Sequence, residues 1–243
     1  MRDFEIRSNK SEYDKCQIKR FQKVLNDLFD NFIQDDGFIC GGFARVCLEE
    51  KEDFKDCSDI DIYCKNIEAF DRIKDRFLSD LYIEDRVSPI AISLKYAFSG
   101  KYPIQLIKPF DAGFIHTSSE SVIEVLNNFD FTITRAAIYR VEIFSAFDKT
   151  KKSYKLEAIA DEDFFNSSNT LVIKNIHCPV AQVYRIAKYI KKGFTVRTME
   201  IVKVLMDWEN RPLQYKQNLI EALQKEDPTQ EEIDKMEKLL HVD

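Results

Sequence analysis

Residues 58–65, with the sequence SDIDIYCK, alternate between polar and apolar side chains. Such alternation is typical of a β-strand, on which residues two apart project from the same face. Ile60 and Ile62 then point into a core, while Asp59 and Asp61 lie side by side, roughly 6.6 Å apart at Cα. Two adjacent carboxylates repel one another unless a cation lies between them. The segment predicts a sheet that carries a divalent-cation site. The alternative is an exposed strand face with two solvated acids.

A diglycine, Gly41-Gly42, separates a short apolar run at residues 38–40 from a helical pattern at residues 43–49. Glycine lets a backbone approach a phosphate closely, and the start of a helix offers unpaired N–H groups to an anion. A tight turn is the simpler interpretation. Because the acidic strand follows so soon, we favour a phosphate-binding turn beside a metal site.

A third acid stands in the sequence Phe129-Asp130-Phe131-Thr132. Asp130 alternates with two aromatic residues, which predicts a strand with an outward-facing carboxylate. On a strand near Asp59 and Asp61, this carboxylate would complete a metal cage. An acid at a strand edge is the alternative.

The remaining pattern predicts an α+β fold. An N-terminal domain, residues 1–140, is expected to hold a mixed, mainly antiparallel sheet flanked by helices, and residues 141–243 to form a mostly helical C-terminal region that begins with a polar, irregular stretch. Periodicity predicts helices at residues 11–33, 67–80, 119–127, 180–192, 197–210 and 228–240. Strands are predicted at residues 38–40, 58–65, 87–98, 102–108 and from 129, with Pro103 indicating a sheet edge.

The composition sets limits on location and partners. The chain has 243 residues, 44% of them hydrophobic, and a formal net charge of −6. The acidic balance disfavours a globally basic nucleic-acid binder. No apolar stretch of about 18 residues and no signal-peptide pattern occurs, so we expect no membrane association. The six cysteines include no CxxC pair and disfavour a disulfide framework, which indicates the reducing cytoplasm. The three histidines are scattered, which disfavours a zinc site.

Three motifs together resemble a known family. GGFAR (41–45), SDIDIY (58–63) and FDFTITRAAIY (129–139) resemble the polymerase-beta-like nucleotidyltransferase superfamily, with the poly(A) polymerase and CCA-adding branch nearest. The arrangement is also similar to uncharacterised nucleotidyltransferases of phages and large DNA viruses, which would place the protein in the cytoplasm of an infected cell. The resemblance covers residues 38–140 and extends weakly to residues 185–194.

The resemblance implies an enzyme that moves a nucleoside monophosphate from an NTP to an acceptor hydroxyl and releases pyrophosphate. Two Mg²⁺ or Mn²⁺ ions would serve the displacement. Asp59 and Asp61 would bridge both ions, and Asp130 would bind the ion that activates the acceptor. The implied nucleotide-binding residues are Gly41, Gly42, Arg45, Ser58, Arg135, Arg185 and Lys188.

Two departures from the family pattern concern the nucleotide. Val46 follows Arg45 where the relatives have an aspartate, and Asn128 and Phe129 replace a pair of arginines. Recognition of the base or of the triphosphate must therefore differ, and the acidic motif that selects bases in CCA-adding enzymes is not evident after residue 141.

Residues 185–203 form the most basic window of the sequence. Six positive side chains stand against Glu200 alone, a net of +5: Arg185, Lys188, Lys191, Lys192, Arg197 and Lys203. This window is expected to contact triphosphate or an RNA acceptor, and a solvated helix face is the alternative. Tyr184 and Tyr189 are candidates for base stacking or for core packing.

Two classes of function remain open at this point. The first is an active nucleotidyltransferase, with an RNA 3′ end as the expected acceptor and a protein or small-molecule hydroxyl as the alternative. A second-messenger synthase would usually carry Gly-Ser in place of Gly41-Gly42. The second class is a catalytically silent nucleotide-binding or interaction module on the same fold. The pattern specifies no oligomeric state.

Overall fold

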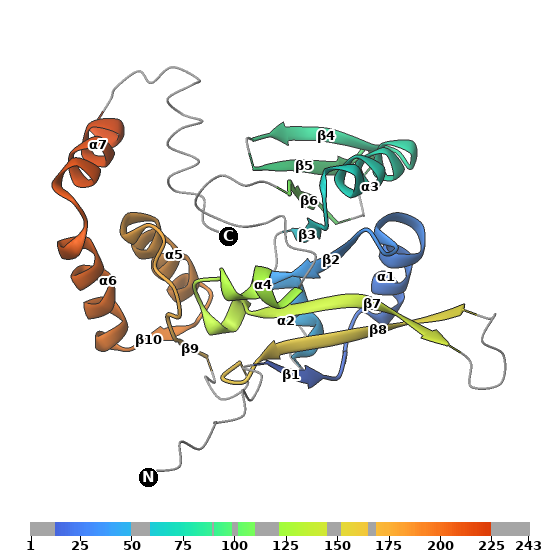
Figure 1. Cartoon of the computed structure of the whole chain (residues 1–243), viewed down its shortest axis with the longest axis horizontal. Coiled ribbons are helices and arrows are strands. Elements are labelled where there is room, and N and C mark those ends of the chain that lie inside the picture. The colour runs from blue at the N-terminus through green and yellow to red at the C-terminus, as the bar shows by residue number, and fades with distance from the viewer. Residues whose placement is uncertain are drawn as a thin grey trace, which may run out of the picture.

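Eight strands form one sheet in the order β1-β8-β7-β2-β3-β6-β5-β4 (Figure 1). The computed structural model describes residues 13–49, 59–88, 90–98, 102–109, 122–144, 152–164 and 169–224. The strands of this sheet are β1 (Tyr13–Cys16), β2 (Gly37–Cys40), β3 (Ile60–Cys64), β4 (Tyr82–Val87), β5 (Ala91–Tyr96), β6 (Ile104–Ile107), β7 (Ala136–Phe144) and β8 (Lys152–Asp161). Neighbouring strands are antiparallel except β3 and β6, which are parallel. The expected α+β class with a mixed, mainly antiparallel sheet is confirmed.

Helices cover both faces of the sheet. The helices of the described chain are α1 (Gln22–Leu28), which continues as a π-helical turn η1 (Phe29–Ile33), α2 (Gly41–Leu48), α3 (Ile67–Ser79), α4 (Val122–Asn127), α5 (Pro179–Lys191), α6 (Thr198–Asn210) and α7 (Leu213–Gln224). The larger core cluster joins α1, α2 and α3 to one face, and it includes Ile60 and Ile62 as the alternation predicts. A smaller cluster joins α4 to the opposite face, on which Tyr63 lies. Asp61, which alternates with the two isoleucines, therefore belongs to the α4 face.

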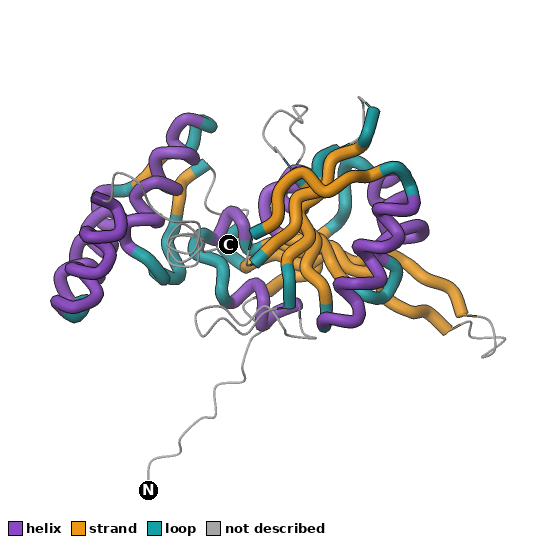
Figure 2. The backbone as a smooth tube through the Cα atoms, turned by 90° about the horizontal axis from the view of Figure 1, so that it is seen from above, coloured by secondary structure: helices purple, strands orange, loops and turns teal. Residues whose placement is uncertain are grey.

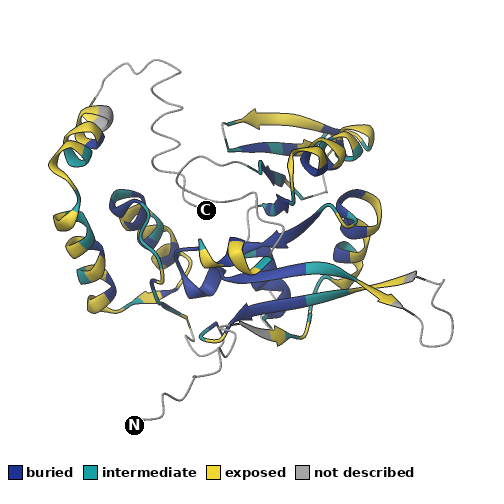
Figure 3. Ribbon diagram, viewed as in Figure 1, coloured by how far each residue is buried: buried dark blue, intermediate teal, exposed yellow. Residues whose placement is uncertain are grey.

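The C-terminal helices stand beside the sheet rather than on it (Figures 1 and 2). A third core cluster joins Phe131 and Ile133, which precede β7, to Ile186 and Tyr189 of α5. Two short strands, β9 (Thr170–Leu171) and β10 (Thr195–Val196), pair in parallel within this region. Figure 3 shows that the central strands are buried, whereas much of α6 and α7 is exposed.

The first helix is shorter than its apolar stripe indicates. Instead of starting near residue 11, it starts at Gln22, because Tyr13–Cys16 pairs with β8 as an edge strand. Phe21, with a φ of 58°, turns the chain between the two elements.

Two further strand predictions are wrong in detail. The predicted strand at residues 87–98 contains β5 but also the last residue of β4, a separate strand that begins at Tyr82. Pro103 does not mark an edge, since β6 lies between β3 and β5. The missing N–H of this proline does not disturb the ladder, because Pro103 precedes the strand and its carbonyl accepts from Ile60 N at 3.0 Å.

The segment that contains Asp130 is not a strand. Phe131 forms an isolated bridge to Ile173, Thr132–Thr134 forms a 3₁₀ turn, and β7 begins only at Ala136. Residues expected to be irregular after 140 instead complete a long β7–β8 hairpin (Figure 1). The sheet therefore continues past residue 140, where the sequence indicated the end of the first domain.

Three helices agree with their predictions, namely α3, α5 and α6. The Asn66 side chain caps α3 by accepting from Ala69 N at 2.8 Å. The helix expected at residues 228–240 lies outside the described residues. Within the described residues, none of the helices has the length and apolar character that a membrane crossing requires.

Candidate functional site

The diglycine and the acidic strand meet at one point. Antiparallel pairing of β2 and β3 places Cys40 opposite Asp61. Gly41 follows with a φ of +74°, a conformation that favours glycine. A Cβ atom at Gly41 would lie only 3.2 Å from Asp61 Oδ2. The carboxylate thus lies against the backbone where a side chain would stand.

The same glycine opens α2. Cys40 occupies the N-cap position and gives no side-chain hydrogen bond to the first turn. The first N–H groups of a helix have no partner within the helix and attract anions. The first turn of α2 therefore offers backbone donors beside the Asp61 carboxylate.

Burial and charge act together on Asp61. Burial raises the pKa of its carboxyl to about 7, and the neighbouring charge of Asp59 adds to the rise. The positive charges of Lys188, Arg185 and Lys192 oppose it. Asp59 lies directly before β3 and is half-buried. A cation between these two carboxylates would remove the repulsion that the fold imposes on them.

The three opposing charges come from the basic window. Arg185 and Lys188 lie on α5, and Lys192 follows its last residue. The side of α5 that carries Arg185 and Lys188, called here the basic side, therefore lies near enough to Asp61 for its charges to act on the pKa of that carboxyl. Tyr189, expected as a base-stacking candidate, is instead buried and packs edge-on against Phe131 at 5.3 Å between ring centroids. Tyr184 is exposed.

Asp130 does not face outward as predicted, because its side chain is buried with 1% of its surface exposed. Arg185 Nη2 donates to Asp130 Oδ1 at 3.0 Å, and Arg185 Nε lies 2.7 Å from Oδ2. Gln182 Nε2 donates to Oδ2 at 3.1 Å. Arg185 and Gln182 of α5 therefore compensate the negative charge of the Asp130 carboxylate without a metal ion.

The expected cage of three acids does not form. Across the described part of the chain, no three His, Cys, Asp or Glu side chains gather closely enough to hold a metal ion together. The oxygen donors of Asp59 and Asp61 suit Mg²⁺ or Mn²⁺, and Asp61 Oδ2 lies beside the space that Gly41 leaves, where the Phe129 ring also stands, 3.6 Å from the Gly41 Cβ position. Arg185 and Gln182 contact both oxygens of Asp130, so its role as a third metal ligand stays a prediction.

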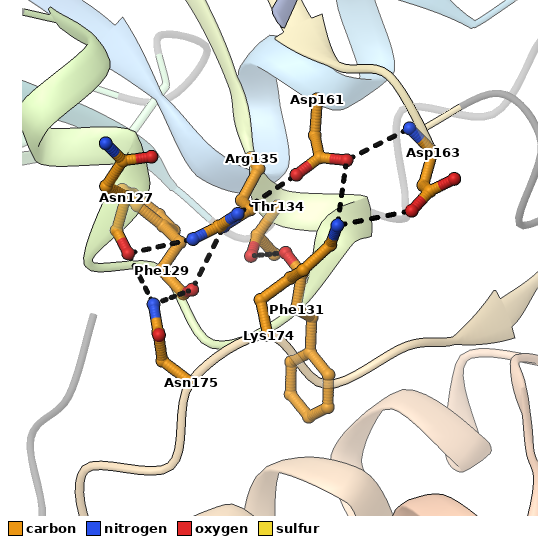
Figure 4. A network of polar contacts seen from close by, with 9 residues as sticks. All are labelled: Asn127, Phe129, Phe131, Thr134, Arg135, Asp161, Asp163, Lys174 and Asn175. Atoms are coloured by element: carbon orange, nitrogen blue, oxygen red, sulfur yellow. Dashed lines mark hydrogen bonds and ion pairs between the residues drawn. The ribbon is translucent and has the colours of Figure 1, made fainter. Parts of the chain in front are cut away.

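Arg135 is a structural residue and not a surface cation. Its guanidinium is buried, with Nη1 3.0 Å from Asp161 Oδ2. Nε donates to the Phe129 carbonyl at 3.2 Å, and Nη2 donates to the Asn127 carbonyl at 2.8 Å. Figure 4 shows these bonds converging on the turn before Asp130. The donors of Arg135, for which the sequence predicted a nucleotide contact, are thus engaged in fixing this turn and Asp161.

The same network ties the C-terminal region to the sheet. Lys174 Nζ lies 3.7 Å from Asp161 Oδ1 and 3.2 Å from Asp163 Oδ2. Asn175 Nδ2 donates to the Phe129 carbonyl at 3.1 Å (Figure 4). Sequence reasoning missed these residues, because they fall in the stretch that was expected to be irregular.

Arg45 is also buried. Its Nη1 lies 2.7 Å from Glu49 Oε2, and its guanidinium stands 5.2 Å from the centroid of the Phe194 ring. The Arg45 Nε atom is buried and has no hydrogen-bond partner among the described residues. Arg45 therefore joins α2 to the C-terminal region. Ser58, the remaining expected phosphate donor, lies outside the described residues.

A cavity of about 360 Å³ lies between α1 and the middle of the β7–β8 pair. Arg140 and Leu156, which line this cavity, alternate along β7 and β8 with residues of the α4 face. The cavity therefore lies on the sheet face opposite Asp61. We assign it no part in the candidate site.

The sequence matches no protein-family model, and no curated protein is similar to it. Solved structures with a similar fold include a CCA-adding enzyme in complex with CTP, with 16% identity and a TM-score of 0.48. A CCA-adding enzyme with ATP has 19% identity and a TM-score of 0.48. The Thermotoga maritima CCA-adding enzyme complexed with tRNA has 16% identity and a TM-score of 0.47. Each comparison covers 90% of this chain and 52% of the other, so the chain spans about half the length of these proteins.

Proposed function

We propose that this protein is a metal-dependent nucleotidyltransferase that moves a nucleoside monophosphate from an NTP to an acceptor hydroxyl, with an RNA 3′ end as acceptor, and releases pyrophosphate. One observation carries the proposal. Asp61 Oδ2 lies 3.2 Å from the position that a Gly41 Cβ atom would occupy. The carboxylate pair suits a cation, and the uncapped start of α2 suits a phosphate. The two therefore lie side by side.

Asp59 and Asp61 are the residues that would hold Mg²⁺ or Mn²⁺. Bound ions of this kind activate the attacking hydroxyl and neutralise charge on the transferred phosphate. The raised pKa of Asp61, which follows from its burial and from Asp59, supports this assignment, because the carboxylate gains most from a cation. We leave Asp130 out of the metal site.

The triphosphate would lie between the first turn of α2 and the basic side of α5. Backbone N–H groups at Gly41 and Gly42 would donate to phosphate oxygens. Lys188 and Lys192, which are exposed and act electrostatically on Asp61, would offset the remaining negative charge. Arg185 would add its charge from the position that Asp130 fixes.

The proposal is tested with labelled NTPs, Mg²⁺ or Mn²⁺, and total RNA. We expect transfer by the natural chain and a loss of at least about a hundredfold in Asp61→Asn and Asp59→Asn. Asp75→Asn is the matched control, because Asp75 is an exposed acid on α3, which packs on the opposite face of the sheet. If no NTP binds and nothing is transferred, the chain is not a nucleotidyltransferase. If the activity in question survives in Asp59→Asn and Asp61→Asn, the silent-module alternative is preferred.

A further inference from the structure

A row of polar residues crosses the sheet from Asp61. Strand pairing places Asp61 opposite Gln105 on β6, Gln105 opposite Ser93 on β5, and Ser93 opposite Arg86 on β4. Residues that pair in register lie on the same face of a sheet. The three residues beyond Asp61 therefore share the face on which the candidate site lies.

A β-bulge determines the charge at the far end of the row. Glu84 pairs with Leu94 and Arg86 pairs with Ser93, so Asp85 has no partner between them. In a regular ladder Asp85 would stand opposite Ser93. The extra residue brings an arginine there in its place, and bulges commonly redirect a side chain in this way. The row thus begins at an acid and ends at a cation.

The far part of the row forms a small polar recess. A cavity of about 50 Å³ is lined by Arg86, Ser88, Ala91, Ser93 and Gln105. Ser88 is occupied, since its Oγ accepts from Ala91 N at 3.0 Å. Ser93 and Gln105 are half-buried, and among the described residues their side chains have no hydrogen-bond partner. The recess therefore offers an unpartnered hydroxyl and amide, and the guanidinium side chain of Arg86, which adds positive charge, lines it as well; these groups suit a phosphate.

The position of the recess separates it from the triphosphate. The helix start at Gly41 follows β2, and α5 packs against the segment before β7, so both lie on the β2 side of β3, whereas the row leaves β3 on the β6 side. Three strand spacings place Arg86 about 14 Å from Asp61. A nucleotide chain whose terminal hydroxyl lies at Asp61 would reach this distance with a backbone phosphate upstream of its end.

We infer that the row Gln105, Ser93 and Arg86 binds the phosphodiester backbone of a single-stranded nucleic-acid acceptor, with Arg86 contacting a phosphate. The inference rests on the proposed function for the direction of the nucleic-acid chain. That chain would run from Arg86 toward its own 3′ end, which would lie at Asp61. It assigns acceptor affinity to β4, β5 and β6, and NTP affinity to α2 and α5.

The test measures binding of a short, fluorescently labelled single-stranded RNA to the full chain by anisotropy at several salt concentrations. We expect Arg86→Ala to weaken binding about five- to tenfold and to reduce the steepness of the salt dependence by about 0.7, the value for one lost phosphate contact on a single strand. Arg86→Lys should keep the salt dependence. Gln105→Ala should weaken binding with an unchanged salt dependence, because the amide is neutral.

Arg72→Ala is the matched control, since Arg72 is an exposed arginine on α3, on the opposite face of the sheet. If Arg86→Ala and Arg72→Ala have equal effects, or if RNA does not bind, the inference is overturned. It is also overturned if Arg86→Ala raises KM for the NTP and not for the acceptor. RNA binding that depends on Arg86 without any nucleotide transfer would support the inference while refuting the proposed function.

Discussion

The guanidinium of Arg185 holds the carboxylate of Asp130, with Nη2 3.0 Å from Oδ1 and Nε 2.7 Å from Oδ2. This pair joins the turn before β7 to α5, and so connects the sheet with the C-terminal helices. Both groups are largely shielded from water, where an ion pair is strong but the loss of one partner leaves a buried charge.

Replacing Arg185 by alanine should therefore destabilise the protein by about 3 kcal/mol or more. Denaturant unfolding measures this change, and Arg197→Ala, at an exposed arginine of the same basic window, should change stability by less than about 0.5 kcal/mol. Asp130→Asn should lower stability and leave Mn²⁺ affinity unchanged. An Asp130→Asn protein of normal stability that no longer binds Mn²⁺ would make Asp130 a metal ligand after all.

Arg135 should behave as a structural residue in the same assay. Its three donors bind Asp161 and the carbonyls of Asn127 and Phe129. Arg135→Ala removes the nearer of the two cations beside the buried Asp161 carboxylate, the other being Lys174, and should destabilise by about 3 kcal/mol. Arg72→Ala, which breaks an exposed pair with Asp36, should lose less than about 1 kcal/mol. Weakened NTP binding at unchanged stability would return Arg135 to the nucleotide site.

Gly41→Ala should damage the site in two ways. The residue has a φ of +74°, and its new Cβ atom would lie 3.2 Å from Asp61 Oδ2. Backbone strain alone costs about 1–2 kcal/mol, whereas the contact should also displace the carboxylate and weaken Mn²⁺ binding. Gly193→Ala separates the two effects, because Gly193 has a φ of +91° with no atom within 4 Å of its Cβ position. Equal loss of Mn²⁺ affinity in both variants would show that the contact with Asp61 has no role.

The stability of the metal-free protein should depend on Asp61 and pH. A folded-state pKa raised from 3.8 to about 7 means that the folded protein binds this proton more tightly than the unfolded chain. The resulting stabilisation is complete at low pH and is lost as the pH rises through about 7. Asp61→Asn should therefore be more stable than the natural chain by more than about 1 kcal/mol at about pH 8. The difference should shrink toward about pH 5.

Thermal unfolding of both proteins across this pH range provides the measurement. Mg²⁺ added above neutral pH should stabilise the natural chain and leave Asp61→Asn unaffected. A difference between the two proteins that stays constant with pH would contradict the burial and charge repulsion assigned to Asp61.

Local sequence signals located the central part of the site. The alternation at Ile60 and Ile62 fixes the face of Asp61, and a glycine is needed at the end of β2 because the backbone there adopts a positive φ. Both properties follow from a few neighbouring residues. The meeting of Gly41 and Asp61 then results from the antiparallel pairing of two adjacent strands.

The roles of the arginines could not be obtained in this way. Asp130 meets Arg185 across 55 positions of sequence, and Arg135 meets Asp161 across 26. An arginine that binds a phosphate and one that binds a distant carboxylate carry the same local pattern, so only the fold distinguishes them. No strand was predicted at residues 152–161, so β8, which supplies Asp161, was also missed.

The central claim is that Asp59 and Asp61, beside the start of α2, hold a divalent cation together with a triphosphate. Electron paramagnetic resonance of Mn²⁺ titrated with a non-hydrolysable NTP measures this directly. We predict that the natural chain, Asp130→Asn and Asp75→Asn immobilise Mn²⁺ in the presence of the nucleotide, and that Asp61→Asn does not. Immobilisation of Mn²⁺ by Asp61→Asn as strong as that by the natural chain would contradict the account.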